Sequence, residues 1–252
     1  MKNKIISKIK AIALYKNPFI YLADLFGFRK EQKIVYELKN GLKFEVRSGT
    51  CDRGIIDEIF AYKIYSPSGF EIKENDTVLD IGAQIGVFSV YAAASAKAGR
   101  VYSFEPFSEN YALLKRNIEL NSRGNIEPFQ MAVAGTAGTK DFYISKNTGG
   151  HSFYGSPKQE KISVQAIALA DFIKEKGLAK IDYFKMDCEG GEYDILFSLP
   201  DEILNKISKI GMEYHNLDET RHVARLREFL ESRGFLVSLA GGIFPMLYAL
   251  RK

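Results

Sequence analysis

The sequence predicts an α/β protein, with a doubly wound, mostly parallel sheet preceded by an N-terminal α/β extension. The first observation is a regular alternation of apolar strands and amphipathic helices from Asp76 onward, typical of a parallel sheet with helices on both faces. The second is a loop with two glycines, residues 82–86, that joins the first of these strands to a helix. The third is a closing pair of strands joined by a Gly-Gly turn, which we expect as an antiparallel hairpin at the sheet edge.

The N-terminal extension, residues 1–70, is expected to contain helices and one hairpin. Residues 1–33 have apolar positions at helical spacing, and Pro18 divides this run in two. The segment VYELKNGLKFEV alternates apolar and polar residues on both sides of Asn40-Gly41, which predicts a β-hairpin. Residues 53–65 carry apolar side chains on one helical face and are predicted as the last helix of the extension.

The main domain, residues 71–252, continues with alternating elements. Strands are expected at residues 77–82, 100–106, 125–135, 161–168, 182–190, 207–216, 234–242 and 243–252. Helices are expected at residues 86–98, 108–121, 169–177, 192–200 and 219–234. A hairpin at residues 140–145 and a glycine-rich segment at residues 147–156 interrupt the alternation.

Positive charge is concentrated near the N-terminus. Residues 1–34 contain eight Lys and Arg and two acidic residues, so they carry +6, and the rest of the chain carries −2 of the formal net charge of +4. A nearly neutral main domain lacks the basic groove that nucleic acids require, so we expect no nucleic-acid partner. The basic, partly apolar N-terminal segment suits peripheral contact with a membrane or, as is more common, packing on its own domain or on a partner.

Cysteine use and hydropathy indicate the compartment. Cys51 and Cys188 are far apart and form no CxxC pair, so the sequence has no zinc or redox motif. A reducing cytoplasm is the natural setting for such cysteines. Because no apolar run is long enough to span a bilayer, we expect a cytoplasmic protein whose only membrane contact would be peripheral.

The loop DIGAQIG, residues 80–86, is the most informative motif. It has the form Gly-x-x-x-Gly and lacks the middle glycine of the G-x-G-x-x-G loop that seats a dinucleotide pyrophosphate. A second strand ends at Glu105, whose carboxylate can accept hydrogen bonds from both hydroxyls of a ribose. Asp80 suits a sulfonium and an amino-acid tail better than it suits a pyrophosphate. These features favour S-adenosylmethionine over NAD or a flavin dinucleotide.

Three segments resemble successive motifs of the FkbM-type methyltransferases: VLDIGAQIGVFSVYAA, SFEPFSENYALLKRNIELN and FKMDCEGGEYDIL. The segment CDRGIIDEIFAYKIY is also similar to that family. The resemblance covers roughly residues 46–216, and DxEGxE is its most specific motif. It implies a Rossmann-like class I methyltransferase sheet with an antiparallel C-terminal strand, S-adenosylmethionine as the cofactor, and a hydroxyl group of a sugar, glycolipid or related small metabolite as the methyl acceptor.

The resemblance also implies which residues bind the cofactor. The methionine part would be held by residues of the first strand end and the loop, namely Asp80, Gly82, Ala83, Gln84 and Gly86. Glu105 would hold the ribose, and Asp187 would lie close to the bound cofactor. Met131 and Ala132 are expected against the adenine, at a position that lacks the acidic residue many methyltransferases use.

Methyl transfer to oxygen needs two partners held in line and a group that removes the hydroxyl proton. Asp187 ends the fourth main strand, and Glu213 and His215 end the neighbouring one, so we expect these three to form a catalytic acid/base cluster. His215 is the first choice of general base because an imidazole titrates near neutrality. A divalent cation bound by the same groups is the alternative, which we do not favour.

Other polar residues are expected around the acceptor. His151, in the glycine-rich segment, and Glu189, in DxEGxE, are predicted to contact the acceptor. Glu192 has a structural interpretation as an acid in the first turn of a helix. Tyr62, Tyr65 and Asp52 either wall the cofactor pocket or belong to the core. The rival functions are an NAD-type oxidoreductase and a non-catalytic Rossmann-like binding protein.

Overall fold

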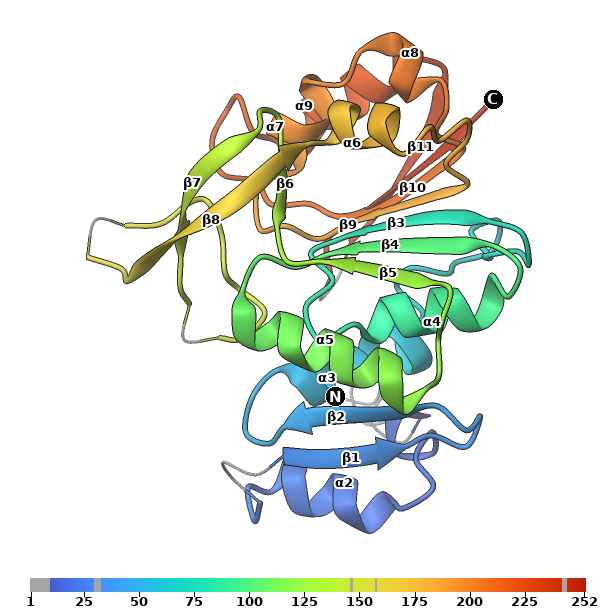
Figure 1. The fold of residues 1–252 in the computed structure, drawn as a ribbon, viewed down its shortest axis with the longest axis vertical. Helices are drawn as coiled ribbons and strands as arrows, with labels where there is room; N and C mark the ends of the chain where they lie inside the picture. Colours follow the sequence, from blue (N-terminus) through green and yellow to red (C-terminus); the bar gives the residue numbers. More distant parts are fainter. Residues whose placement is uncertain (1–9, 30–32, 146, 157, 242–243) are drawn as a thin grey trace.

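The computed structural model describes residues 10–29, 33–145, 147–156, 158–241 and 244–252 (Figure 1). Within these residues the chain forms a seven-stranded sheet, a three-stranded sheet and a two-stranded sheet. The expected helical segment at residues 1–9 lies outside the described residues, as do residues 30–32. None of the helices in the described part combines the length and the apolar character that crossing a membrane requires.

The seven-stranded sheet has the order β11-β12-β10-β9-β3-β4-β5. Its parallel strands are β3 (Thr77–Ile81), β4 (Arg100–Phe104), β5 (Ile126–Phe129), β9 (Tyr183–Met186), β10 (Lys209–Glu213) and β11 (Phe235–Ala240). The last strand, β12 (Met246–Arg251), runs antiparallel to both of its neighbours, β10 and β11. The predicted doubly wound fold with an antiparallel C-terminal strand is therefore confirmed. The closing hairpin does lie at the edge, but β11 is its outer strand and β12 is inserted one place in.

Helices cover both faces of this sheet (Figure 1). One face packs against α4 (Val87–Ser95) and α5 (Ser108–Leu120). The other face is covered by α6 (Leu169–Glu175), α7 (Glu192–Phe197), α8 (Asp201–Leu204) and α9 (Val223–Glu231). The strand side chains alternate between these two apolar clusters: Val78 belongs to the first, whereas Leu79 belongs to the second. Both faces of the central strands are buried, which explains their continuous apolar sequences.

The prediction of one strand over residues 125–135 is wrong. The chain leaves the main sheet after β5 and enters a separate sheet as β6 (Ala132–Ala134). There it pairs with β8 (Lys161–Ala168), which in turn pairs with β7 (Gly138–Tyr143). Figure 1 shows β7 and β8 projecting beside the carboxyl ends of β4 and β5. The apolar side chains of residues 125–135 fit either sheet, so local patterning cannot reveal the change of partner.

The extension contains a helix and a hairpin, as predicted. Helix α2 (Pro18–Leu25) starts at the proline that divides the apolar run, and the Asn17 side chain caps it. Strands β1 (Lys33–Glu37) and β2 (Lys43–Arg47) form the hairpin around Asn40-Gly41. The next helix, α3 (Asp52–Asp57), continues as the π-helix η1 (Glu58–Tyr62) and ends at Lys63 in a left-handed conformation, so it ends earlier than the predicted residue 65.

The extension and the main domain share one apolar core. Phe44 of β2 contacts Phe60 of η1 with ring centroids 5.8 Å apart, and Phe60 contacts Tyr91 of α4 at 5.7 Å. All three belong to one cluster that reaches from Ala11 to Tyr248. The division at residue 70 is therefore a change in sequence pattern within a continuous core.

Candidate functional site

A cavity of about 270 Å³ opens at the carboxyl ends of β3, β4, β9 and β10, where open α/β sheets bind their ligands. The extension and the segment after β7 close its remaining sides. The residues that line it and that matter below are Glu58, Tyr65, Gly82, Ala83, Gln84, Glu105, Ala132, His151, Lys185, Asp187, Glu189 and Glu213.

The two glycines of the loop are required by close backbone contacts. Gly82 has φ +73°, and a Cβ atom there would lie 1.8 Å from the carbonyl oxygen of Asp187. Gly86 has φ +82°, and a Cβ atom there would lie 2.4 Å from Cδ1 of Leu114 in α5. Gly82 lines the cavity, whereas Gly86 lets α4 begin against α5. The Gly-x-x-x-Gly spacing therefore places the loop backbone between β9 and α5.

Glu105 is buried at the cavity wall, directly after β4. Its Oε2 accepts a hydrogen bond from the Gln84 backbone N–H at 2.9 Å, and its Oε1 accepts one from the Phe107 N–H at 2.8 Å. Burial raises the pKa of Glu105 to about 7, even though these hydrogen bonds act in the opposite direction. Each oxygen keeps a free lone pair, so the carboxylate can still accept two hydroxyl groups.

Asp80 is fully buried behind the loop and does not reach the cavity wall. Its carboxylate is 3.0 Å from Nζ of Lys185 and accepts a hydrogen bond from the Ser89 hydroxyl at 2.6 Å. Lys185 stands opposite Asp80 in the β3–β9 register and also donates to the Gly82 carbonyl at 2.7 Å. Asp80 thus contacts the loop through Lys185, and its expected contact with the cofactor stays a prediction.

The far end of the cavity is acidic. Asp187 lies just after β9, Glu213 ends β10, and Glu58 comes from the π-helix of the extension. The Tyr65 hydroxyl donates a hydrogen bond to Oδ2 of Asp187 at 3.2 Å. Burial, followed by repulsion from Asp187, raises the pKa of Glu58 to about 8 and that of Glu213 to about 7. The pKa values of these carboxyl groups are therefore close to the pH at which a general base works well.

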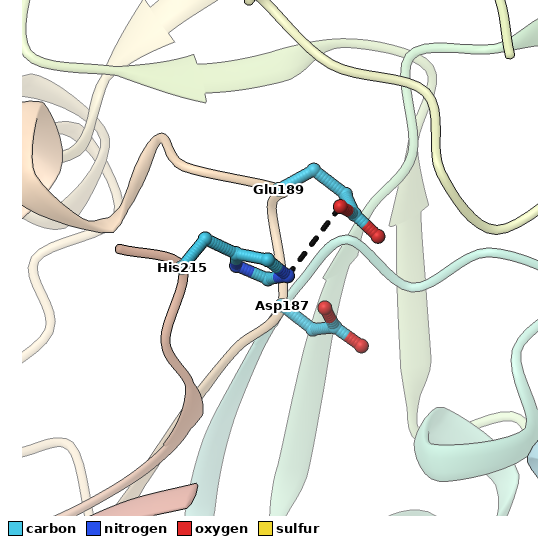
Figure 2. Close-up of side chains that lie close together, drawn as sticks. All are labelled: Asp187, Glu189 and His215. Carbon is cyan, nitrogen blue, oxygen red and sulfur yellow. Dashed lines mark ion pairs between the residues drawn. The ribbon is translucent and has the colours of Figure 1, made fainter. Parts of the chain in front are cut away.

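His215 lies between two glutamates, Glu189 and Glu192, and Figure 2 shows it beside Glu189 and Asp187. Its Nε2 is 3.4 Å from Oε2 of Glu189, and its Nδ1 is 3.1 Å from Oε1 of Glu192. Burial alone would lower the pKa of His215, but the hydrogen bond to Glu192 and the nearby carboxylates raise it to about 9. This raised pKa favours the protonated imidazole, and His215 is absent from the residues that line the cavity.

The DxEGxE motif forms the turn that holds these groups. Glu189 and Gly190 both have positive φ, +51° and +102°, so the chain reverses sharply after Asp187. Glu192 is fully buried, and its Oε1 faces the backbone N–H groups of Cys188 and Gly190 at 3.3 Å. Glu192 is an acid in the first turn of α7, as expected, and its buried carboxylate also contacts the turn and His215.

Three side chains at this turn present donor atoms suited to a cation. One ligand atom each from Asp187, Glu189 and His215 lies within 4.8 Å of the other two (Figure 2). Two oxygens and one imidazole nitrogen form a donor set that divalent transition metals accept. This geometry keeps the metal alternative open to test.

The opposite end of the cavity is closed by the segment after β7. His151 is buried, its Nδ1 accepts a hydrogen bond from the Ser145 N–H at 2.9 Å, and its ring lies 4.4 Å from that of Phe107. Its Nε2 is buried and finds no hydrogen-bond partner among the described residues. Ala132 lines the same cavity, whereas Met131 packs into the apolar core and does not. His151 thus lies beside the segment that follows Glu105.

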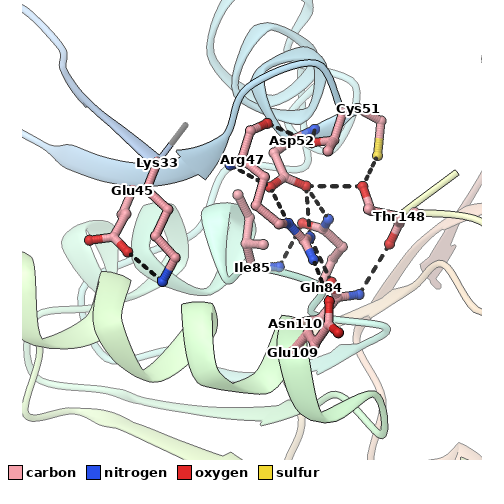
Figure 3. Close-up of polar contacts among 12 residues, drawn as sticks. Lys33, Glu45, Arg47, Cys51, Asp52, Gln84, Ile85, Glu109, Asn110 and Thr148 are labelled. Atoms are coloured by element: carbon pink, nitrogen blue, oxygen red, sulfur yellow. Dashed lines mark hydrogen bonds and ion pairs between the residues drawn. The ribbon is translucent and has the colours of Figure 1, made fainter. Parts of the chain in front are cut away.

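A buried polar network ties the extension to the loop (Figure 3). The Asp52 carboxylate accepts hydrogen bonds from Nε of Arg47 at 2.9 Å and from the side-chain amide of Gln84 at 2.8 Å. Arg47 also donates to Asn110 of α5 at 2.7 Å, and Asn110 donates to the carbonyl oxygen of Thr148 at 3.1 Å. Burial raises the pKa of Asp52, but the hydrogen bonds and the charge of Arg47 outweigh this effect and hold the pKa below its usual value. The network fixes Gln84 in its left-handed conformation, φ +50°.

Three residues of the site were not predicted from the sequence: Glu58, Lys185 and Arg47. Lys185 had a usable signal, because a lysine within the buried strand YFKM needs a buried acid, and Asp80 lies in the adjacent strand. Glu58 and Arg47 had no such signal in the sequence, since long-range packing brings Glu58 to the cavity and Arg47 to Asp52. Of the residues left open, Tyr65 lines the cavity, Asp52 supports the loop, and Tyr62 packs on Phe244.

Comparison with known proteins is consistent with this geometry. Residues 80–237 match the family model described as the methyltransferase FkbM domain. The chain is 26% identical over 212 residues to the 31-O-demethyl-FK506 methyltransferase FkbM of Streptomyces tacrolimicus, covering 71% of this chain and 80% of that protein. It is 28% identical over 229 residues to the AMB antimetabolite synthetase AmbE of Pseudomonas aeruginosa, covering 73% of this chain but only 11% of that much longer protein.

Among solved structures, the fibrillarin pre-rRNA processing protein of Methanococcus jannaschii superimposes with a TM-score of 0.50. The two chains are 15% identical, and the match covers 87% of this chain and 83% of that one. At this level of identity the likeness concerns the fold alone.

Proposed function

Because the chain belongs to the FkbM family of S-adenosylmethionine-dependent methyltransferases, we propose that it methylates a hydroxyl group of a sugar, glycolipid or related small metabolite. The observation that carries the proposal is the acidic end of the cavity, formed by Glu58, Asp187 and Glu213. Glu189 also lines the cavity. Carboxylates can both hold hydroxyl groups and remove a proton from one of them. The name of the Streptomyces relative specifies methylation at an oxygen.

The residues at the other end of the cavity fit the nucleoside half of S-adenosylmethionine. Glu105 keeps two lone pairs for the ribose hydroxyls, and Gly82 and Ala83 line the same cavity. The unpartnered Nε2–H of His151 supplies a donor for a ring nitrogen of adenine. We therefore propose that His151 contacts the cofactor, instead of the acceptor as the sequence analysis predicted. Membership of the family also favours this cofactor over the dinucleotide of the rival oxidoreductase.

The bound cofactor supplies an activated methyl group, and the chain supplies alignment and a base. Glu213 takes the hydroxyl proton in this proposal, since it lines the cavity and its pKa is about 7. Tyr65 orients Asp187 through its hydrogen bond. His215, whose raised pKa favours the protonated form, positions Glu189 instead of accepting the proton. This assignment replaces the expectation that His215 is the base.

The proposal is tested by supplying methyl-labelled S-adenosylmethionine with a panel of nucleotide sugars, glycolipids and polyketide glycosides. We expect label in at least one acceptor, on an oxygen atom, and loss of transfer when that hydroxyl is replaced by hydrogen. Label found only on a nitrogen or carbon atom would overturn the assignment of the acceptor. A catalytically inert protein would show no transfer to any acceptor while still binding the cofactor product.

A further inference from the structure

We propose that the N-terminal extension docks on an anionic lipid surface through three exposed phenylalanines, Phe19, Phe26 and Phe28, here called the aromatic face. Their exposed fractions are 79%, 69% and 80%, the three largest among the exposed large apolar residues of the described chain. A cluster of such side chains on one element marks an interaction site, whereas single exposed apolar residues are ordinary. This inference is independent of the methyl acceptor.

The aromatic face results from the geometry of α2. Phe19 and Phe26 are seven residues apart, so they lie on the same side of the helix, two turns from each other. The helix then stops at Gly27, which has φ +76°, and the Phe28 N–H bonds back to the carbonyl oxygen of Ala23 at 2.9 Å. This stop brings the rings of Phe26 and Phe28 to 6.5 Å from each other.

Buried contacts on the other side of α2 hold the aromatic face outward. Tyr21 donates to Asp57 at 2.8 Å, and Asp24 accepts from Tyr36 at 2.8 Å and from Arg53 at 3.0 Å. Because Tyr21 and Asp24 are buried and hydrogen-bonded, the helix cannot roll to hide its phenylalanines without breaking these contacts. The only ionisable residue of α2 apart from Tyr21 is Asp24, so its outer side offers no charge to water.

Charge identifies the partner as a lipid surface. Residues 1–34 carry a net +6, while the rest of the chain carries −2. Lys10 and Arg29 are exposed, and Lys16, also exposed, is paired with Glu37. Aromatic rings beside cations suit the boundary between anionic headgroups and acyl chains. A second copy of the chain would instead bring two +6 segments together, which is electrostatically unfavourable.

The sequence has no tryptophan, so one can be added as a lone reporter. Phe28→Trp should show a blue shift of its emission with vesicles of phosphatidylcholine and phosphatidylglycerol, and little shift with phosphatidylcholine alone. The matched control is Leu236→Trp, on the edge strand β11 at the far end of the molecule, where Leu236 is 55% exposed (Figure 1). We expect no shift in the control, and high salt should weaken the Phe28→Trp response.

A triple variant, Phe19→Ser with Phe26→Ser and Phe28→Ser, should leave roughly tenfold less protein bound to the mixed vesicles, because the apolar anchor is lost. Its S-adenosylhomocysteine affinity should equal that of the wild type, which shows that it folds. The proposal is overturned by equal emission shifts in the two tryptophan variants or by no shift in either. It is also overturned if the triple variant abolishes self-association of the wild type while vesicle binding stays unchanged.

Discussion

At the scale of single residues, Glu105 should decide the affinity for the cofactor. Glu105→Gln removes the charge that strengthens two ribose hydrogen bonds, and hydrogen bonds to charged groups are worth about 1.5–3 kcal/mol, so we expect roughly tenfold to a hundredfold weaker binding. Calorimetric titration with S-adenosylhomocysteine measures this directly. The control is Glu119→Gln, whose side chain is 69% exposed on the outside of α5; equal affinities for the two variants would remove the ribose assignment.

Glu213 should control turnover and its dependence on pH. The ionised carboxylate is the form that accepts a proton, and the pKa of Glu213 is about 7, so kcat should rise as the pH rises through neutrality and then level off. Glu213→Gln should lower kcat by about 10²–10⁴-fold and remove this rise, with little change in cofactor affinity.

His215→Gln gives the contrasting profile. It removes a cation that positions Glu189, so we expect a smaller loss of kcat in which the rise with pH persists. If His215→Gln abolished the rise and Glu213→Gln preserved it, the imidazole would be the base after all.

The donor set of Asp187, Glu189 and His215 makes metal dependence a separate test. Because the proposed base acts without a metal, EDTA should leave the initial rate unchanged. If EDTA abolished the activity and Mg²⁺ or Mn²⁺ restored it, we would conclude that a bound cation, and not Glu213 alone, activates the acceptor hydroxyl.

At the scale of elements, the extension should support the cofactor loop through Arg47 and Asp52. Arg47→Met leaves the fully buried Asp52 without its cation, and breaking a buried pair costs about 3 kcal/mol or more of folding stability. Urea unfolding measures the loss. The control is Arg116→Met, a 48% exposed partner of Glu45, for which we expect less than about 1 kcal/mol.

The elements that could be predicted are those whose reasons are local. The loop at residues 80–86 was recognisable because the backbone contacts of Gly82 and Gly86 tolerate no side chain, and the turn at Asn40-Gly41 because its geometry needs those residue types. The change of sheet between β5 and β6 was not predictable, since Ala132–Ala134 would fit either sheet. The π-helix that presents Glu58 was equally hidden, because it depends on packing against the main domain.

At the scale of the whole molecule, the site is completed by parts that are distant in sequence. The strand ends supply Glu105, Asp187 and Glu213, as the fold class predicted, whereas Glu58 comes from the extension and His151 from the segment after β7. Glu105, Asp187 and Glu213 can be found from the sequence, because open α/β sheets bind ligands at the carboxyl ends of their strands. This rule cannot find Glu58 and His151, because only the shared core brings the extension and that segment to the cavity.

The most direct test of the account is a crystal structure with S-adenosylhomocysteine. We predict that both ribose hydroxyls donate to Glu105, that the adenine lies beside His151 and Ala132, and that the sulfur faces Asp187 and Glu213. A ligand bound in the opposite direction, or one that leaves Glu105 without a ribose contact, would contradict it.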